Sequence, residues 1–338
     1  GAGTLQIVLD AFRGWDAEYP IIDDLVAACG RPATFTLASG NEGPPLWRRV
    51  LEMMAVSKSA GRQITAQVMP RPIGLIGGLE LSVHPFIMCP SWQKIAHLPL
   101  AEKVQAMRDR SLRAALLSET PAEGHPFNAL GRNWRWMFPL DNPPNYAPTP
   151  DMSFAARAAT QGTTPEALVY DRFVNTNGKG MFLATLGNFE GGTLDSAYEM
   201  LMHPDCVPAL GDGGAHYGAI CDASYSTFLL DHWVRNGKDK AIDVAQAIHM
   251  LSAKSARAVG LTDRGVLKLG AKADINVIDM DRLSIALPHI EYDLPAGGRR
   301  LDQKATGYDA TIVSGSIIRR HDMATGARPG KLVRGAAH

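Results

Sequence analysis

Residues 203–216 read His-Pro-Asp-Cys-Val-Pro-Ala-Leu-Gly-Asp-Gly-Gly-Ala-His, a short apolar run that ends at a carboxylate, Asp212. The two glycines after Asp212 allow nearby backbone conformations that are closed to other residues. In a barrel of alternating strands and helices, reacting groups lie at the carboxyl ends of the strands. We therefore expect Asp212 to lie at a strand end, as a zinc ligand and proton shuttle. The alternative is an Asp that caps a loop or the next helix.

Short apolar runs and helical patterns alternate on the amino-terminal side of this segment. We expect strands over residues 5–9, 34–37, 64–69, 181–186 and 207–210, which is typical of βα units with a parallel sheet. Residues 44–59 predict a helix, with Val50 and Met54 on its apolar face and Gly61 at its end. Five strands are too few to close an eight-stranded barrel, so three lie upstream of Gly1 or are hidden in the middle of the chain.

That middle, residues 84–150, is rich in proline and aromatic residues and is interpreted as an inserted lid or pocket wall. A helix is expected over residues 242–259. After it, residues 273–279 alternate with period two, and Ser314-Gly315 between two apolar runs indicates a hairpin. The predicted organisation is a barrel portion over residues 1–262, with its insert, and a small β-rich domain over residues 263–338.

Composition excludes several classes of partner. Of the 338 residues, 34 are Lys or Arg and 34 are Asp or Glu, so we expect no nucleic-acid binding. The four cysteines form no CxxC pair, which favours reduced thiols in a cytoplasmic protein. No apolar stretch is long enough to predict a membrane span. The first residues lack a Met and a signal-peptide pattern, so we expect an internal cut and a missing amino-terminal part of the same protein.

The ordered set of motifs resembles the N-acyl-D-amino-acid deacylase branch of the amidohydrolase superfamily. The matching segments cover most of the chain and are densest after His203: residues 211–216, 231–235, 260–265, 272–279, 293–298 and 325–335. The resemblance implies an α/β fold, a partial (β/α)8 TIM-type barrel with a small carboxyl-terminal β-sandwich domain, and hydrolysis of an amide by metal-bound hydroxide. It assigns Asp212 to the catalytic, metal-binding Asp after the eighth strand.

The metal site that the resemblance implies is incomplete in this chain. No two of the ten histidines are separated by one residue, so the usual His-x-His pair is expected upstream of Gly1. The resemblance also implies a metal-binding His after the fifth strand, but residues 36–41 at that strand end, and residues 67–72 at the end of the next strand, contain no His. A single weaker metal, a different ligand set or loss of hydrolysis are each compatible with this pattern. The expected cofactor is zinc, as one or two ions, or another divalent metal.

Three further residues are candidates for substrate binding. Arg71 could hold a substrate carboxylate with its planar fork, or pair with an acidic side chain of the protein. His216 could line the pocket, donate to an oxyanion, ligate metal or orient Asp212. Asn188 could supply a polar pocket group or form a turn.

The first functional hypothesis is hydrolysis of the amide bond of N-acyl-D-amino acids or similar small amides. The second keeps the enzyme class but replaces the substrate with a cyclic amide or carbamate-like molecule. The third is a metal-free binding protein on the same barrel, suggested by the missing histidines. In each case the expected partner is a small molecule, with homo-oligomerisation open.

Overall fold

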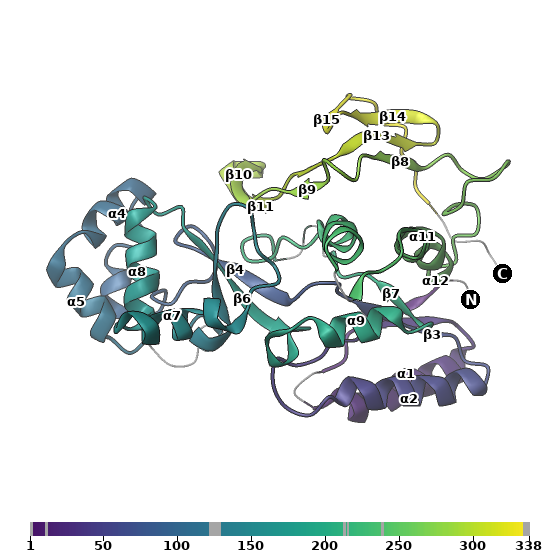
Figure 1. The fold of residues 1–338 in the computed structure, drawn as a ribbon, viewed down its shortest axis with the longest axis horizontal. Coiled ribbons are helices and arrows are strands. Elements are labelled where there is room, and N and C mark those ends of the chain that lie inside the picture. The colour runs from purple at the N-terminus through teal and green to yellow at the C-terminus, as the bar shows by residue number, and fades with distance from the viewer. Residues whose placement is uncertain are drawn as a thin grey trace.

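The computed structural model describes residues 3–10, 13–121, 130–211, 214, 216–237 and 240–333. Figure 1 shows three regions: a parallel sheet covered by helices, an inserted unit to its left, and the carboxyl-terminal strands above both. The inserted unit interrupts the chain between two neighbouring strands of the parallel sheet. The fold is therefore an α/β layer carrying two additions.

The parallel sheet has the strand order β1-β2-β3-β7. Each neighbouring pair runs parallel, with Leu5 opposite Ala33 and Ala66 opposite Cys206. Among the described residues these four strands form an open sheet, and its edges are β1 and β7. The predicted strands in this sheet are confirmed, with the following bounds: β1 (Leu5–Ile7), β2 (Ala33–Thr36), β3 (Ile64–Val68) and β7 (Cys206–Pro208).

Helices α1 (Trp15–Cys29) and α2 (Leu46–Ser59) lie side by side along the sheet (Figure 1). Helix α2 buries Val50 and Met54 as the periodicity predicts. Burying a side chain of this size contributes roughly 1.5–3 kcal/mol to folding, as an upper bound. Gly61 follows the helix with a φ of 78°, a left-handed conformation that glycine adopts without strain.

The inserted unit contains an antiparallel sheet of order β4-β6-β5, and one expectation is wrong here. Residues 181–186 do form a strand, but it pairs antiparallel with both neighbours and does not belong to the parallel sheet. Glycine permits the close approach of β4 to β6, because a Cβ at Gly74 would lie 2.4 Å from the carbonyl oxygen of Ala184. The strands are β4 (Ile73–Gly77), β5 (Met137–Leu140) and β6 (Met181–Gly187).

Helices of the inserted unit pack around a second apolar core, which contains Phe86, Trp92, Tyr170 and Phe173. The Phe86 ring meets those of Tyr170 and Phe173 edge to face, the geometry that aromatic quadrupoles favour. Residues 84–118 are thus a packed helical unit on this sheet. The helical segments are α3 (Pro90–Gln93), α4 (Leu100–Met107), α5 (Arg110–Ser118), η1 (Trp134–Trp136), η2 (Pro150–Met152), α7 (Phe154–Gln161), α8 (Pro165–Asn175) and η3 (Glu190–Gly192).

The chain returns to the parallel sheet through α9 (Asp195–Met202) and continues after β7 into two mostly helical stretches. The expected helix over residues 242–259 is present as three consecutive segments, the middle one a π-helical turn. Trp233 and Met250 from these stretches join the main core. The segments are α10 (Tyr225–Phe228), η4 (Leu229–Arg235), α11 (Val244–His249), η6 (Met250–Lys254) and α12 (Ser255–Ala258).

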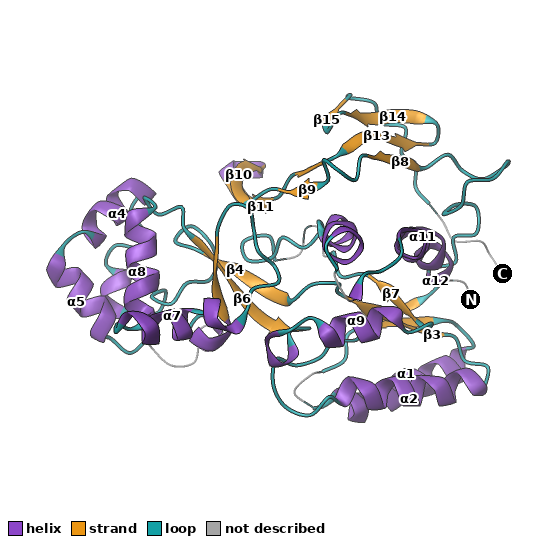
Figure 2. Cartoon of the chain, in the orientation of Figure 1, coloured by secondary structure: helices purple, strands orange, loops and turns teal. Residues whose placement is uncertain are grey.

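The carboxyl-terminal region consists of strands (Figure 2). One antiparallel sheet has the order β15-β14-β13-β8, and two ribbons pair β10 with β11 and β12 with β9. Ser314 and Gly315 both have positive φ, so the predicted hairpin turn is confirmed. The elements are β8 (Ile275–Ile278), β9 (Ser284–Ile285), β10 (His289–Leu294), η7 (Pro295–Gly297), β11 (Gly298–Asp302), β12 (Ala305–Thr306), β13 (Tyr308–Val313), β14 (Ser316–Arg320) and β15 (Met323–Ala324).

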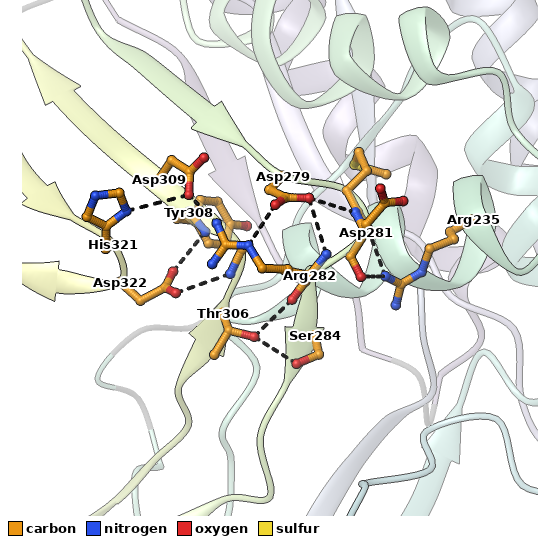
Figure 3. Close-up of polar contacts among 12 residues, drawn as sticks. Arg235, Asp279, Asp281, Arg282, Ser284, Thr306, Tyr308, Asp309, His321 and Asp322 are labelled. Carbon is orange, nitrogen blue, oxygen red and sulfur yellow. Dashed lines mark hydrogen bonds and ion pairs between the residues drawn. The ribbon is translucent and has the colours of Figure 1, made fainter.

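Polar contacts join these strands to the helices below them (Figure 3). Arg282 donates from Nε to Asp279 at 2.6 Å and also pairs with Asp309. Arg235, at the end of η4, donates to the carbonyl oxygen of Met280 at 2.8 Å. The Thr227 and Tyr308 hydroxyls lie 2.7 Å apart, which adds a second link. The Arg235 and Thr227 contacts hold the carboxyl-terminal strands against the helical stretch, while those of Arg282 lie among the strands and their connections.

Two simpler expectations concern the membrane and the cysteines. In the described part of the chain, every helix is too short or too polar to cross a bilayer. Cys29, Cys89, Cys206 and Cys221 are free thiols. Burial raises the pKa of the Cys206 thiol to about 12, so this cysteine is an inert packing residue.

Candidate active site at the carboxyl ends of the parallel strands

The carboxyl ends of the four parallel strands meet at one edge of the sheet. Asp10 follows β1, Ser39 follows β2, and Arg71 follows β3. At the end of β7, the amide of Ala209 donates to the carbonyl oxygen of Val68 at 3.0 Å. Asp212 comes three residues later and lies outside the described residues.

Asn188 connects the ends of two parallel strands. Its Oδ1 accepts from the Ser39 amide, and its Nδ2 donates to the Met69 carbonyl oxygen, each at 2.9 Å. The side chain is fully buried, and a φ of 54° places the backbone in the left-handed region that asparagine tolerates. An amide suits this position because it offers a donor and an acceptor on one planar group. Asn188 thereby fixes the spacing of the strand ends after β2 and β3.

The strand end after β2 is also fixed by helix α9 and by the inserted unit. The hydroxyl oxygens of Ser39 and Ser196 lie 2.7 Å apart, and both side chains are buried. Asn41 donates from Nδ2 to the carbonyl oxygen of Thr185 at 2.8 Å. Gly187 is required here, since a Cβ would lie 2.8 Å from the Ser39 carbonyl oxygen. Ser39, Asn41 and Gly187 thus form a tight polar seam.

Arg71 is fully buried beside the loop that follows Asp212. Its guanidinium donates to Asp222 at 2.8 Å, to the Cys221 carbonyl oxygen at 2.8 Å and to the Ser224 hydroxyl at 3.0 Å. Its Cζ lies 3.9 Å from the ring centroid of Tyr146, a cation–π contact. Among the described residues its Nε has no acceptor. Arg71 therefore pairs with an acidic side chain of the protein, which was the alternative left open by the sequence. Its role in substrate binding stays a prediction.

A hydrogen-bond ring encloses this guanidinium. The Ser224 hydroxyl donates to Gln303 Oε1 at 2.5 Å, and Gln303 Nε2 donates to the Tyr146 hydroxyl at 2.8 Å. Burial raises the pKa of Tyr146, and the Arg71 charge opposes this shift in part, so the phenol stays neutral at physiological pH. Gln303 belongs to the carboxyl-terminal strands, Tyr146 to the inserted unit and Arg71 to the end of β3. All three regions meet here.

His216 is exposed and has a φ of 48°. Its carbonyl oxygen accepts from the amides of Ala219 and Ile220, which closes a turn. The structure does not bring its imidazole together with Arg71 or Asn188, both of which are buried. Its proposed contacts with substrate or with Asp212 stay predictions.

The loop that carries His216 is held from both sides. The Ser82 amide donates to the Gly218 carbonyl oxygen at 2.9 Å, and the Leu301 amide donates to that of Tyr217 at 2.8 Å. Ser82 lies in the inserted unit and Leu301 in β11. The loop after β7 is therefore positioned by the same two additions that surround Arg71.

The described strand ends do not form a zinc ligand set. Residues 8–10, 37–41 and 69–71 contain no His or Cys, and their only carboxylate, Asp10, is exposed. Zinc sites use imidazole, thiolate and carboxylate ligands. Ligands besides Asp212 would have to come from outside these strand ends.

A cavity of about 1140 Å³ lies at the opposite end of the sheet. Pro32, Gln63 and Pro204, which precede β2, β3 and β7, contribute to its lining, with Lys254 and Arg257. Ligands of parallel α/β sheets bind at the carboxyl ends of the strands, so we do not assign a functional site to this cavity.

A parallel sheet of βα units with polar groups at its carboxyl edge defines an α/β protein. A family model described as the amidohydrolase family matches residues 5–319. The chain belongs to the amidohydrolase family, which confirms the superfamily expected from its motifs.

The fold is similar to that of N-acyl-D-glutamate deacylase from Bordetella bronchiseptica, which was solved with zinc and a phosphonate inhibitor. The TM-score is 0.50 at 16% identity, over 95% of this chain and 54% of that one. A D-aminoacylase structure gives a TM-score of 0.48 at 13% identity, over 96% and 54% of the two chains. The chain thus spans about half the length of these proteins.

A curated relative, the 5'-deoxyadenosine deaminase of Methanosarcina acetivorans, is 35% identical over 96 residues. The matched segment is 27% of this chain and 20% of that protein.

Proposed function

We propose that the complete protein is a metal-dependent amidohydrolase that cleaves the amide bond of N-acyl-D-amino acids or similar small amides. The observation that carries this proposal is the amidohydrolase family match over residues 5–319. The deacylase-like motifs around Asp212 favour an acylated amino acid as the substrate class. We further propose that the parallel strands form part of an eight-stranded barrel, with an amino-terminal segment pairing with the edge strands β1 and β7.

In this proposal Asp212 moves the proton. Its carboxylate accepts a proton as water adds to the amide carbonyl carbon, and returns it to the nitrogen as the carbon–nitrogen bond breaks. The products are a carboxylic acid and a free amine. Zinc, the proposed cofactor, would lower the pKa of the attacking water and polarise the carbonyl group. Because the described strand ends supply no ligand set, proton transfer is the role that we propose for Asp212.

The substrate-binding roles proposed for Arg71, His216 and Asn188 differ in what they require. His216 is exposed and could contact a substrate directly. Arg71 has one donor, Nε, without a described acceptor, but its terminal nitrogens already bind Asp222 and Ser224. A substrate carboxylate would therefore have to displace Asp222. Asn188 would contribute indirectly, because its side chain links the strand ends after β2 and β3.

Asp212→Asn in the complete protein tests the proposal. The amide cannot accept the proton, so kcat for N-acyl-D-amino acids should fall by about 10²–10⁴-fold, the usual contribution of general acid–base catalysis. Amine release from matched D and L substrates measures this, with Asp151→Asn as a control because Asp151 is an exposed carboxylate outside the strand ends. Retained turnover in Asp212→Asn excludes the role of Asp212. No bound metal and no turnover in the parent protein would favour a binding protein.

A second candidate is hydrolysis of a carbon–nitrogen bond in a cyclic substrate. The 35% identity to a segment of 5'-deoxyadenosine deaminase supports it, because that protein's name denotes removal of an amino group from a heterocycle. Adding cyclic amides and aminopurine nucleosides to the substrate panel separates the two candidates. Turnover of these compounds alone would exclude the acylated amino acids.

A further inference from the structure

The ribbon of β10 and β11 places three possible metal ligands on one of its faces. In Figure 1 this ribbon lies between the inserted sheet and the four-stranded carboxyl-terminal sheet. His289, Glu291 and Asp302 each offer one ligand atom, and these atoms all lie within 4.8 Å of one another. The three side chains are partly buried.

The strand register accounts for this grouping. His289 lies directly opposite Asp302, and Glu291 is two residues along β10 from His289. Successive side chains of a strand alternate between faces, so residues two apart share a face with the residue directly across. The pairing of β10 with β11 therefore brings the ligands together before any ion is present.

The spacing of the ligand atoms fits a small divalent ion. His289 Nε2 lies 2.9 Å from Glu291 Oε1 and 3.8 Å from Asp302 Oδ2. Zinc holds nitrogen and oxygen ligands at about 2.0–2.2 Å, so the ligand atoms of a tetrahedral site are roughly 3.3–3.5 Å apart. The two observed distances bracket this value, and the ligand atoms of Glu291 and Asp302 lie within 4.8 Å of each other.

Arg300 orients one of the carboxylates. It donates to Asp302 Oδ1 at 2.8 Å, while Asp302 Oδ2 is the oxygen nearer His289. The same guanidinium binds both oxygens of Asp293, at 2.8 and 2.7 Å. Residues that hold a ligand by its second oxygen are typical of metal sites, because they fix the direction of the binding atom. Glu291, Asp293, Asp302 and Arg300 together leave a net negative charge that a divalent cation would offset.

His289 also lines a cavity of about 410 Å³ between the ribbon and the inserted unit. Tyr292 contributes to the lining and donates to Glu80 Oε1 at 2.6 Å, which joins the ribbon to the inserted unit. Three protein ligands leave a tetrahedral ion with one open position, the arrangement of sites that bind water or a ligand. The cavity offers space for such a molecule beside the imidazole.

We propose that His289, Glu291 and Asp302 bind a zinc-type divalent ion through one imidazole nitrogen and two carboxylate oxygens. The site lies on the β10–β11 ribbon, and the proposal does not depend on the proposed function. An imidazole with two carboxylates suits zinc and other first-row transition ions better than calcium or magnesium, which favour oxygen ligands throughout.

The test is titration of the chelator-treated protein with Zn²⁺ by calorimetry and with Co²⁺ by absorption. The exposed thiol is first removed by Cys29→Ser, since a thiolate would also bind either ion. We expect the cobalt ligand-field band of a nitrogen and oxygen site, without a thiolate charge-transfer band. His289→Ala and Asp302→Asn should each weaken binding by at least about tenfold, because loss of even an orienting residue costs 10–100-fold.

His321→Asn is the matched control. His321 Nδ1 lies 3.8 Å from Asp309 in the same region, a His–carboxylate pair outside the three-ligand group. Its binding curve should match that of the parent protein. Asp302→Asn keeps the acceptor for Arg300, so it still reports on the site if His289→Ala fails to fold, which circular dichroism would show. A folded Asp302→Asn variant that binds as many ions as the parent protein, with unchanged affinity, overturns the proposal.

Discussion

Replacing Arg71 with Met should destabilise the protein far more than replacing an exposed arginine. Met keeps an apolar stem of similar length but removes the charge, three hydrogen bonds and the contact with the Tyr146 ring. Asp222 then loses its cationic partner, and its side chain is only 15% exposed. Breaking a buried ion pair from one side costs about 3–5 kcal/mol. We expect a loss of unfolding free energy in this range.

Arg48→Met is the matched control. Arg48 also makes an ion pair at 2.8 Å, with Glu199, and a cation–π contact at 4.4 Å, with Trp47. The Arg48 and Glu199 side chains are 55% and 42% exposed, so solvent screens the pair and its loss should cost about 0–1 kcal/mol.

Urea denaturation followed by tryptophan fluorescence measures both variants. With a slope of about 3 kcal/mol/M, Arg71→Met should lower the midpoint by roughly 1 M or more. Equal shifts for Arg71→Met and Arg48→Met would refute the argument from burial. Far-UV circular dichroism shows whether each variant still folds.

Two further predictions concern the inserted unit. Burial, with a smaller effect of Lys103, lowers the pKa of His84 to about 3. Between about pH 6.5 and pH 4 the unfolded chain therefore binds up to one more proton than the folded chain at this site. As the pH falls through this window, the free energy of unfolding should decrease by up to about 1.4 kcal/mol per pH unit. His84→Asn can still accept from the Phe86 amide, and it should flatten the measured pH dependence in this window; an identical slope would contradict the prediction. Gly74→Ala should destabilise by about 1–3 kcal/mol in thermal unfolding, because its Cβ meets the Ala184 backbone, whereas Gly330→Ala, in open space, should have no effect.

Local sequence patterns predicted two kinds of element correctly. These are elements that bury only one face, and elements whose ends carry a glycine or a turn sequence. Helix α2 follows from its apolar spacing and from Gly61, and the β13–β14 hairpin follows from Ser314-Gly315. Strand β6 was placed in the wrong sheet for a physical reason. All but one of its residues are buried, and an apolar run buried on both faces reads the same in a parallel or an antiparallel sheet.

The strands beside β6 carry weak signals. β4 contains Gly74 and Gly77, and β5 contains Pro139, residue types that are depleted in strands. Their positions are set by tertiary contact, since Gly77 makes room for the Phe182 ring. The reason that glycine suits a position in β4 therefore appears only in the folded structure.

The candidate site shows a similar limit. Arg71 is conspicuous in sequence as a charge after an apolar run, but its partner Asp222 lies 151 residues further along the chain. Part of the ligand group on β10 and β11 is visible in the sequence, because His289 and Glu291 are two residues apart and so share a face of a strand. Asp302 completes it only through strand register, which an isolated strand pattern does not specify.

The geometry around Arg71 links the carboxyl-terminal strands to the parallel strand ends. Gln303 bonds both Ser224 and Tyr146, and these two groups contact the guanidinium from different sides. A buried charge of this kind tolerates little displacement, because each lost bond leaves a polar group unsatisfied. The strands after β7 therefore do more than cover the sheet. They help to fix the loop that begins at the end of β7, and with it the segment on which the proposed chemistry depends.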